Sequence, residues 1–207
     1  MVNLNSIKIY RMTHIENIPH ILANGITHAN SPNSNPNYKP IGDGTLISTR
    51  SIKDIPDGRL LGDFIPFYFG VRTPMLYVVQ RGFNSVARTK AEDIVYIVSS
   101  VQNVMDCNLD FVFTDGHAVD GLTEFYPPSQ ISEVDKIVDF TAAFAEFWSG
   151  TSDTDLKRRK EAEFLVEGDL PLESIRGFVV YNETAMEKLL ALGIHERKVI
   201  IKKNFYF

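Results

Sequence analysis

Short apolar segments with strand-like composition occur along the whole chain, and they constrain its fold more than any other feature. Residues 7–12 alternate apolar and polar side chains, as a half-buried strand does. Further strand-like segments are 65–69, 75–80, 94–98, 111–114, 163–168, 177–181 and 199–207. Because most of these segments are far apart in sequence, a sheet that contains them must join non-adjacent strands. The pattern predicts a strand-rich α+β fold, and 207 residues fit a single domain over 1–207.

Helical signals lie between the strands. Thr13 is followed three residues later by Glu16, which matches a capping box, and the apolar spacing that follows predicts a helix stopped by Asn24 and Gly25. Further helices are expected at 85–93, 131–148 and 182–193.

Two other segments matter for function. Residues 28–44 contain many turn formers and no periodicity, so they form a long loop of the kind that serves as a lid, a binding loop or a disordered segment. LISTR, residues 46–50, reads as a strand that ends at Arg50.

Composition excludes several classes of protein. One cysteine, Cys107, allows neither an internal disulfide framework nor a cysteine-rich zinc site, and it fits a reducing, cytoplasmic setting. No apolar run approaches the roughly 18 residues of a membrane span, and the polar N-terminus lacks a signal-peptide core. The net charge is −5, but a locally basic groove for nucleic acid remains as open as unfocused scatter.

One carboxylate departs from ordinary patterning. In RRKEAEFLVEG, residues 158–168, basic residues precede Glu163, which leads directly into an apolar strand. A solvated strand end is one interpretation of this glutamate. A carboxylate aimed into a pocket is the other.

Several fragments resemble one family, the DarT proteins. They are IYRMTHIENIPHILANGI, NSNPNYKPIG, LISTR, GDFIPFYFGVRTPMLY, FTDGHA, KEAEFLV and the closing NFYF, in the expected order over nearly the full chain. The resemblance implies an ADP-ribosyltransferase fold, with a split central β-sheet around an NAD cleft and flanking helices. It implies transfer of ADP-ribose from the co-substrate NAD onto bases of single-stranded DNA by a bacterial toxin. A macrodomain antitoxin of the DarG type is the expected partner.

The resemblance also implies roles for individual residues. Glu163 stabilises the oxocarbenium-like transition state formed when nicotinamide leaves. Arg50 is also catalytic, and we expect it to orient the substrates and stabilise charge, because a guanidinium is a poor general base. Residues expected at the NAD are Thr13, His14, Asn24, Gly25, Arg50, Tyr68 and Tyr77, the two tyrosines facing the nicotinamide.

The nucleic acid is expected on another set of residues. His117 of FTDGHA can stack on a base or form a hydrogen bond to it. Asp115 and His117 have no third metal ligand at suitable spacing, so no metal site is expected. An enlarged, partly helical segment, 116–160, would form the platform for DNA, and Arg72, Arg88, Lys157 and Arg158 would contact phosphates.

The choice of acceptor stays open at the level of sequence. The NSNPNYKPIG loop and PFYFGVRTPMLY resemble the thymidine-modifying branch of the family more than the guanosine-modifying one. Guanosine, RNA or protein acceptors, NAD hydrolysis and a catalytically idle nucleic-acid-binding module are the alternatives.

Overall fold

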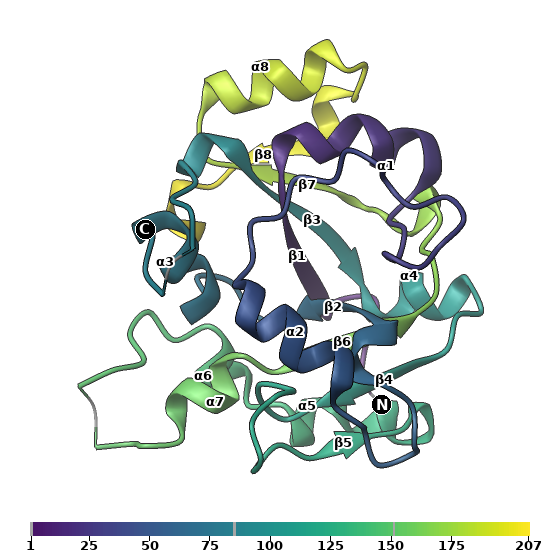
Figure 1. The fold of residues 1–207 in the computed structure, drawn as a ribbon, viewed down its shortest axis with the longest axis vertical. Helices are drawn as coiled ribbons and strands as arrows, with labels where there is room; N and C mark the ends of the chain where they lie inside the picture. The colour runs from purple at the N-terminus through teal and green to yellow at the C-terminus, as the bar shows by residue number, and fades with distance from the viewer. Residues whose placement is uncertain (1, 85, 151) are drawn as a thin grey trace.

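One sheet of eight strands, in the order β5-β4-β6-β2-β1-β3-β7-β8, organises the computed structural model, which describes residues 2–84, 86–150 and 152–207 (Figure 1). The strands are β1 (Lys8–His14), β2 (Phe64–Tyr68), β3 (Ile94–Ser100), β4 (Phe111–Thr114), β5 (Phe125–Tyr126), β6 (Glu163–Glu167), β7 (Gly177–Val180) and β8 (Val199–Ile201). Neighbours in this order are mostly distant in sequence, so the predicted α+β fold with non-adjacent strands is confirmed.

The sheet is split in its middle, between β1 and β2. β1 pairs with β3 along its whole length, from Lys8 to His14, but it meets β2 only where Tyr10 pairs with Tyr68. The Arg11 guanidinium spans the gap just beyond this pair, where its Nη1 donates to the Pro66 carbonyl at 3.0 Å. The predicted split central sheet is therefore confirmed.

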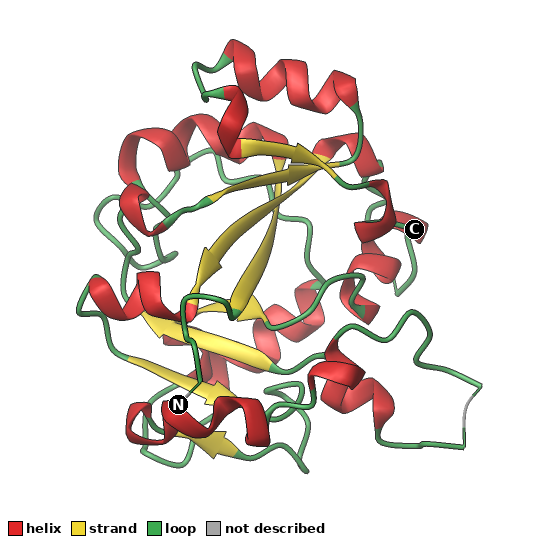
Figure 2. Ribbon diagram, turned by 180° about the vertical axis from the view of Figure 1, so that it is seen from behind, coloured by secondary structure: helices red, strands yellow, loops and turns green. Residues whose placement is uncertain are grey.

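The helices lie around this sheet. They are α1 (Ile18–Asn24), α2 (Gly44–Ile52), α3 (Pro74–Arg81), α4 (Val101–Asp106), α5 (Val134–Ile137), α6 (Phe140–Ala143), α7 (Leu156–Lys160) and α8 (Glu183–Ala191). α5, α6 and α7 gather at the end of the molecule opposite α8 (Figures 1 and 2). They belong to the long segment between β4 and β6, which is partly helical as predicted.

Apolar residues from both halves of the sheet form the main core. Ile9, Phe67, Ile97 and Phe164 are fully buried in it. The C-terminal aromatic segment covers another core region, where the Tyr206 hydroxyl donates to the carbonyls of β3 and β7. The two halves of the sheet are thus held by packing beyond the split.

Two segments predicted as strands are helices. LISTR lies in α2, which Asp43 caps by accepting a hydrogen bond from the Thr45 N–H at 2.8 Å. Residues 75–80 lie in α3, which the Thr73 side chain caps and which ends at Gly82 in the left-handed region. In both cases a cap before the segment outweighed its β-branched or apolar composition.

Other predicted elements have different bounds. The helix expected over 131–148 is broken at Asp139, whose carboxylate caps the Ala142 N–H and starts α6. The helix expected over 85–93 is only a 3-10 turn at Ala91–Asp93 within the described residues, and residue 85 lies outside them. β1 continues through Thr13, so the predicted Thr13 cap is wrong, and the His14 imidazole accepts the Glu16 N–H instead.

Candidate active site

Glu163 begins β6 and is fully buried. Its backbone N–H donates to the Thr114 hydroxyl at 2.9 Å, which fixes the start of the strand against β4. Its Oε1 accepts the Ala118 N–H at 2.9 Å, and its Oε2 accepts Arg50 Nη1 at 2.9 Å. A buried carboxylate with these partners is held in one orientation. The basic residues that precede it lie in α7, which ends at Lys160.

Arg50 extends from α2 and covers Glu163 from the cavity side. Its side chain is 15% exposed and lines a cavity between the two halves of the sheet, whereas Glu163 lies behind it. Arg50 Nη2 is buried and has no hydrogen-bond partner among the described residues. Because an unpaired buried donor is costly, Arg50 Nη2 marks a position where a hydrogen-bond acceptor of a ligand would be stabilised.

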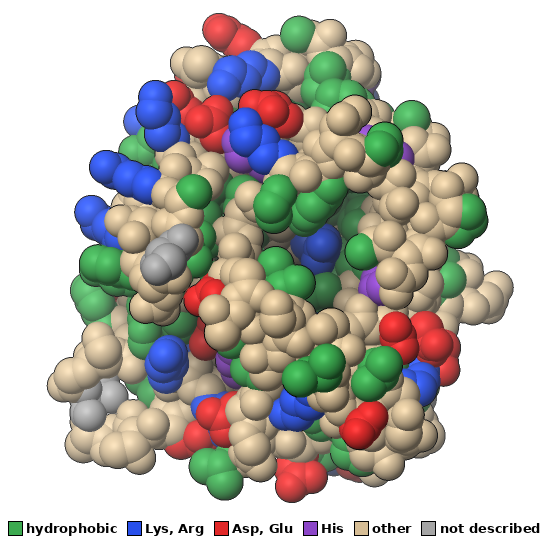
Figure 3. Space-filling model, in the orientation of Figure 1, with side chains coloured by type: hydrophobic (Ala, Val, Ile, Leu, Met, Phe, Trp, Pro, Cys, Tyr) green, Lys and Arg blue, Asp and Glu red, His purple; other side chains and the backbone are tan. Residues whose placement is uncertain are grey.

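The cavity beside Arg50 is built from both halves of the sheet and from the loop before α2. Its wall includes Arg11 and Tyr68 from the strands, and Tyr38 and residues 40–43 from the loop. The face of the molecule shown in Figure 3 is hollowed near its centre, and a Lys or Arg side chain is visible at the bottom of the hollow.

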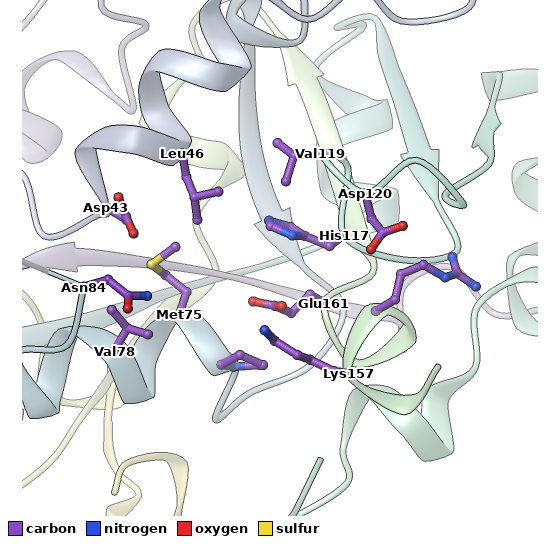
Figure 4. Close-up of a pocket in the computed structure, with 12 residues that line it drawn as sticks. Asp43, Leu46, Met75, Val78, Asn84, His117, Val119, Asp120, Lys157 and Glu161 are labelled. Atoms are coloured by element: carbon purple, nitrogen blue, oxygen red, sulfur yellow. The ribbon is translucent and has the colours of Figure 1, made fainter. Parts of the chain in front are cut away.

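A second cavity continues from the first one. The two share Asp43, Leu46, Met75 and His117, so they form one groove. In the second cavity the side chains of His117, Glu161 and Lys157 point toward a common space, opposite Met75 (Figure 4). A groove with two adjoining cavities can hold a donor substrate and an acceptor side by side.

Electrostatics single out Glu161 within the second cavity. Burial raises the pKa of this carboxyl, and His117, Lys157 and the Met75 backbone N–H oppose the rise. His117 Nε2 lies 4.0 Å from Glu163 Oε1. His117 therefore lies beside Glu163 at the junction of the two cavities.

The two predicted tyrosines have different positions. Tyr68 lines the first cavity and pairs with Glu163 across β2 and β6; burial, followed by the Glu163 charge, raises its pKa well above 10. Tyr77 lies in α3 and packs against Phe83, Trp148 and Phe207, so the structure does not bring it to the cavity. Its predicted direction rested on a strand that is a helix.

The predicted NAD residues near α1 lie outside the walls of both cavities. Thr13 is buried, and its hydroxyl accepts a hydrogen bond from the Asn17 side-chain amide. Burial lowers the pKa of the His14 imidazole. Gly25 has a φ of +77°, and a Cβ there would meet the Leu170 carbonyl at 2.1 Å. The Asn24 side-chain amide donates a hydrogen bond to the His20 carbonyl and lies against the His20 imidazole. A contact of these residues with NAD stays a prediction.

Only some of the residues predicted to contact DNA line the groove. Lys157 lines the second cavity and forms no ion pair with the described residues. Arg158 lines it too, but its guanidinium is bound by Asp115 and Asp155, which raise its pKa.

Two further arginines predicted at DNA lie outside both cavities. Arg72 stacks on Phe207, and Arg88 Nε donates to the Gln80 carbonyl.

Sequence reasoning missed many residues of the groove, among them Arg11, Met75 and Glu161. Arg11 and Met75 lie in the wall, and Glu161 lies at the base of the second cavity. Glu161 stands two residues before Glu163, and this spacing at a strand entrance was the one available signal.

Among the described residues, no group of three or more His, Cys, Asp or Glu side chains could hold a metal ion. Within the same residues, no helix has the length and apolarity needed to cross a membrane.

Known proteins resemble this chain over most of its length. Residues 10–207 match the family described as DarT, ssDNA thymidine ADP-ribosyltransferase. A DNA ADP-ribosyl transferase from Thermus sp. strain 2.9 is 33% identical over 96% of this chain and 95% of its own. A fusion of DNA ADP-ribosyl transferase and DNA ADP-ribosyl glycohydrolase from Thermosipho africanus is 30% identical over 97% of this chain and 49% of its own.

Solved structures agree. Thermus sp. 2.9 DarT with ADP-ribosylated ssDNA superposes with a TM-score of 0.85 at 31% identity, covering 97% of this chain and 96% of that one. The same protein with NAD+ gives a TM-score of 0.79 at 32% identity, covering 97% and 98%. Together with the groove and its buried Arg50–Glu163 pair, these matches establish that the chain belongs to the DarT family of NAD-dependent DNA ADP-ribosyltransferases.

Proposed function

We propose that this protein transfers ADP-ribose from NAD to thymidine bases of single-stranded DNA, with Glu163 and Arg50 as its catalytic pair. The observation that carries the proposal is the pairing of the fully buried Glu163 with Arg50 at the wall of a groove, with the Arg50 Nη2 left without a partner among the described residues. The family match supports thymidine as the acceptor.

Transfer requires one glycosidic bond to break and another to form. The bond between the ribose C1′ and the nicotinamide nitrogen breaks with its electron pair leaving on nicotinamide. The ribose then carries developing positive charge, which a fixed carboxylate stabilises more strongly than water does. Glu163 is held for this role by the Ala118 N–H. A ring nitrogen of the base then forms the new bond to C1′ and loses its N–H proton to water.

Arg50 must act as a movable partner in this scheme. It covers Glu163 from the cavity side, and its planar set of donors suits a diphosphate or a base edge. Binding of NAD would draw the guanidinium toward the ligand and uncover the carboxylate. Tyr68, beside Glu163, would pack against the nicotinamide.

The ends of β1 and α1 would hold the remainder of the dinucleotide. Thr13 and His14 lie where β1 turns into the first helical segment, and Asn24 and Gly25 end that segment. Polar groups at a helix start suit anionic or ribose ligands. The Tyr77 position supports no contact with nicotinamide.

The acceptor would occupy the second cavity. His117 stands beside Glu163, where a base could stack or accept a hydrogen bond from it, and Lys157 could contact a phosphate. The position of Arg158 supports a mainly structural role, because two carboxylates already bind it.

A DarG-type antitoxin is the partner we propose, in a toxin–antitoxin pair. The support is the Thermosipho africanus relative, in which one chain joins a DNA ADP-ribosyl transferase to a DNA ADP-ribosyl glycohydrolase. An enzyme that removes the modification would protect the cell that makes this protein.

The decisive variant is Glu163→Gln, which keeps the shape of the side chain and removes its charge. We expect transfer to a thymidine-containing oligonucleotide, followed by mass, to fall at least about a hundredfold, because one electrostatic group at a transition state typically contributes that much. NAD binding, measured by calorimetry, should persist. Glu167→Gln is the matched control, since Glu167 lies on the same strand but pairs with Arg59 outside the groove.

Comparing acceptors separates the alternatives. The proposal fails if wild-type protein adds no ADP-ribose to thymidine-containing DNA while a guanosine, RNA or protein acceptor is modified. NAD consumption that is unaffected by DNA would instead indicate hydrolysis.

A further inference from the structure

Four aromatic rings form a cluster beside the groove. The Tyr77 ring lies at its centre, with centroid distances of 5.6 Å to Phe83, 5.8 Å to Trp148 and 5.1 Å to Phe207. Trp148 and Phe207 are themselves 5.5 Å apart. The rings come from α3 and the turn after it, from the segment before α7 and from the C-terminal residue. We call this cluster, with Arg72 and Arg81, the aromatic surface.

Two arginines place positive charge on these rings. The Arg72 guanidinium lies 4.5 Å from the Phe207 centroid, and the Arg81 guanidinium lies 5.6 Å from that of Tyr77. Arg72 Nη1 also reaches Glu146 at 3.4 Å, but its Nε is buried and has no hydrogen-bond partner among the described residues. Rings interleaved with guanidinium groups have the composition of a surface that binds single-stranded nucleic acid.

The aromatic surface adjoins the second cavity on two sides. Val78 and Asn84, next in sequence to Tyr77 and Phe83, line that cavity (Figure 4). On the other side, α7 contributes Lys157 to the cavity and, one turn later, places the Lys160 ammonium 5.9 Å from the Trp148 ring. A strand leaving the cavity would therefore meet the rings within a few nucleotides.

Exposure distinguishes this cluster from the aromatic packing of the core. Phe83 is 50% exposed and the Tyr77, Trp148 and Phe207 rings are half-buried, whereas the core rings Phe69, Phe113 and Phe164 are fully buried. Phe147, next to Trp148, is 68% exposed. Exposed neighbouring aromatic residues at the mouth of a site indicate a binding surface more than a packing role.

We propose that the aromatic surface stacks on bases that flank the target nucleotide and so holds the single strand across the groove. This inference rests on the proposed function, because it takes DNA as the acceptor. Stacking is tolerant of base identity, so the surface would add affinity while the cavity selects the base.

Phe83→Leu tests the proposal, because it keeps apolar bulk and removes the ring face. The substrates are two oligonucleotides of equal length with one central thymidine triplet, one with ordinary flanking bases and one with abasic flanks. Both carry the same phosphates, so their difference reports contacts with the flanking bases. The readouts are the KM and kcat for transfer and the Kd for the oligonucleotide without NAD, measured by fluorescence anisotropy.

For wild-type protein, abasic flanks should raise KM and Kd about tenfold, the effect of losing one stacked base. Phe83→Leu should raise both about tenfold on the ordinary oligonucleotide, leave kcat unchanged, and lose sensitivity to abasic flanks. Phe144→Leu is the matched control, because this ring is 48% exposed, nearly as much as Phe83, but packs on Tyr10 outside the aromatic surface. It should behave like wild type on both substrates.

Two results would overturn the inference: a wild-type protein indifferent to abasic flanks, or a Phe83→Leu protein as sensitive to them as wild type. If wild-type protein transfers nothing to DNA but its Kd still depends on flanking bases and on Phe83, the proposed function fails and the stacking surface stands. The two failures are thus distinguishable.

Discussion

Glu161 is a carboxyl group that the fold holds at some loss of stability. Its pKa is raised above 4.5 mainly by burial, so the folded state favours the protonated form. The stabilisation from this proton is complete below pH 4.5, the ordinary value, and is lost as pH rises through the raised pKa. A strained or unfavourable group at a cavity is typical of a functional site.

We therefore expect Glu161→Gln to stabilise the protein by about 1 kcal/mol at pH 8 and to have no effect near pH 4, in urea denaturation. The neutral amide avoids ionisation in the buried site. Glu187→Gln, on exposed α8, is the control and should show no such pH dependence. Equal stability of the Glu161→Gln variant and wild type at both pH values would contradict this account.

The sequence predicted Arg50 and Glu163 as a catalytic pair but did not show how the two side chains meet. Arg50 and Glu163 were identified through the family resemblance, and the structure pairs them at 2.9 Å. Nothing in the sequence showed that Arg50 covers Glu163, or that Arg158 is bound by two carboxylates. Such partners depend on tertiary contacts between segments distant in sequence.

Among the secondary-structure elements, the buried strands were predictable from the sequence and the short helices around the groove were not. β3, β4, β6 and β7 have continuous apolar composition because both faces of the sheet are covered. α2 and α3 contain residues that favour strands, and only their caps, Asp43 and Thr73, indicated helices. The cap signals were present in the sequence but were outweighed by composition.

Attachment of the long segment between β4 and β6 depends on one close approach. A Cβ at Gly70, just after β2, would lie 2.0 Å from the Ala143 carbonyl oxygen. Close by, the buried Lys160 ammonium donates to the carbonyls of Val71, Ala143 and Ala145 at 3.2, 3.2 and 2.6 Å. α6 is thus fixed to the end of β2 by backbone contacts.

Gly70→Ala should lower the free energy of unfolding by about 2–3 kcal/mol, because backbone rather than a flexible side chain must move. Urea denaturation measures this change. Gly121→Ala serves as the control, since no atom lies within 4 Å of its added Cβ, and its stability should match that of wild type. A Gly70→Ala protein as stable as wild type would show that α6 is not held at this point.

This protein is acidic and its substrate DNA is a polyanion, so only a few of its cationic side chains can contact the phosphates. Net charge is −5, and most of the basic cluster at 157–160 is already neutralised or buried. Arg158 and Arg159 pair with carboxylates, and Lys160 binds backbone carbonyls. Lys157 alone among these four lies in the groove without an ion pair to the described residues.

Salt dependence of binding follows from this distribution of charge. Each phosphate contact on single-stranded DNA contributes about 0.7 to the slope of log Kd against log salt. Lys157→Ala should therefore lower the slope by about 0.7, whereas Lys198→Ala, at an exposed residue between α8 and β8 and outside both cavities, should leave it unchanged. The slopes come from anisotropy titrations of one oligonucleotide over a range of salt. An equal loss in both variants would mean that the overall charge attracts DNA, whereas a loss confined to Lys157 places the phosphate beside His117 and the acceptor cavity.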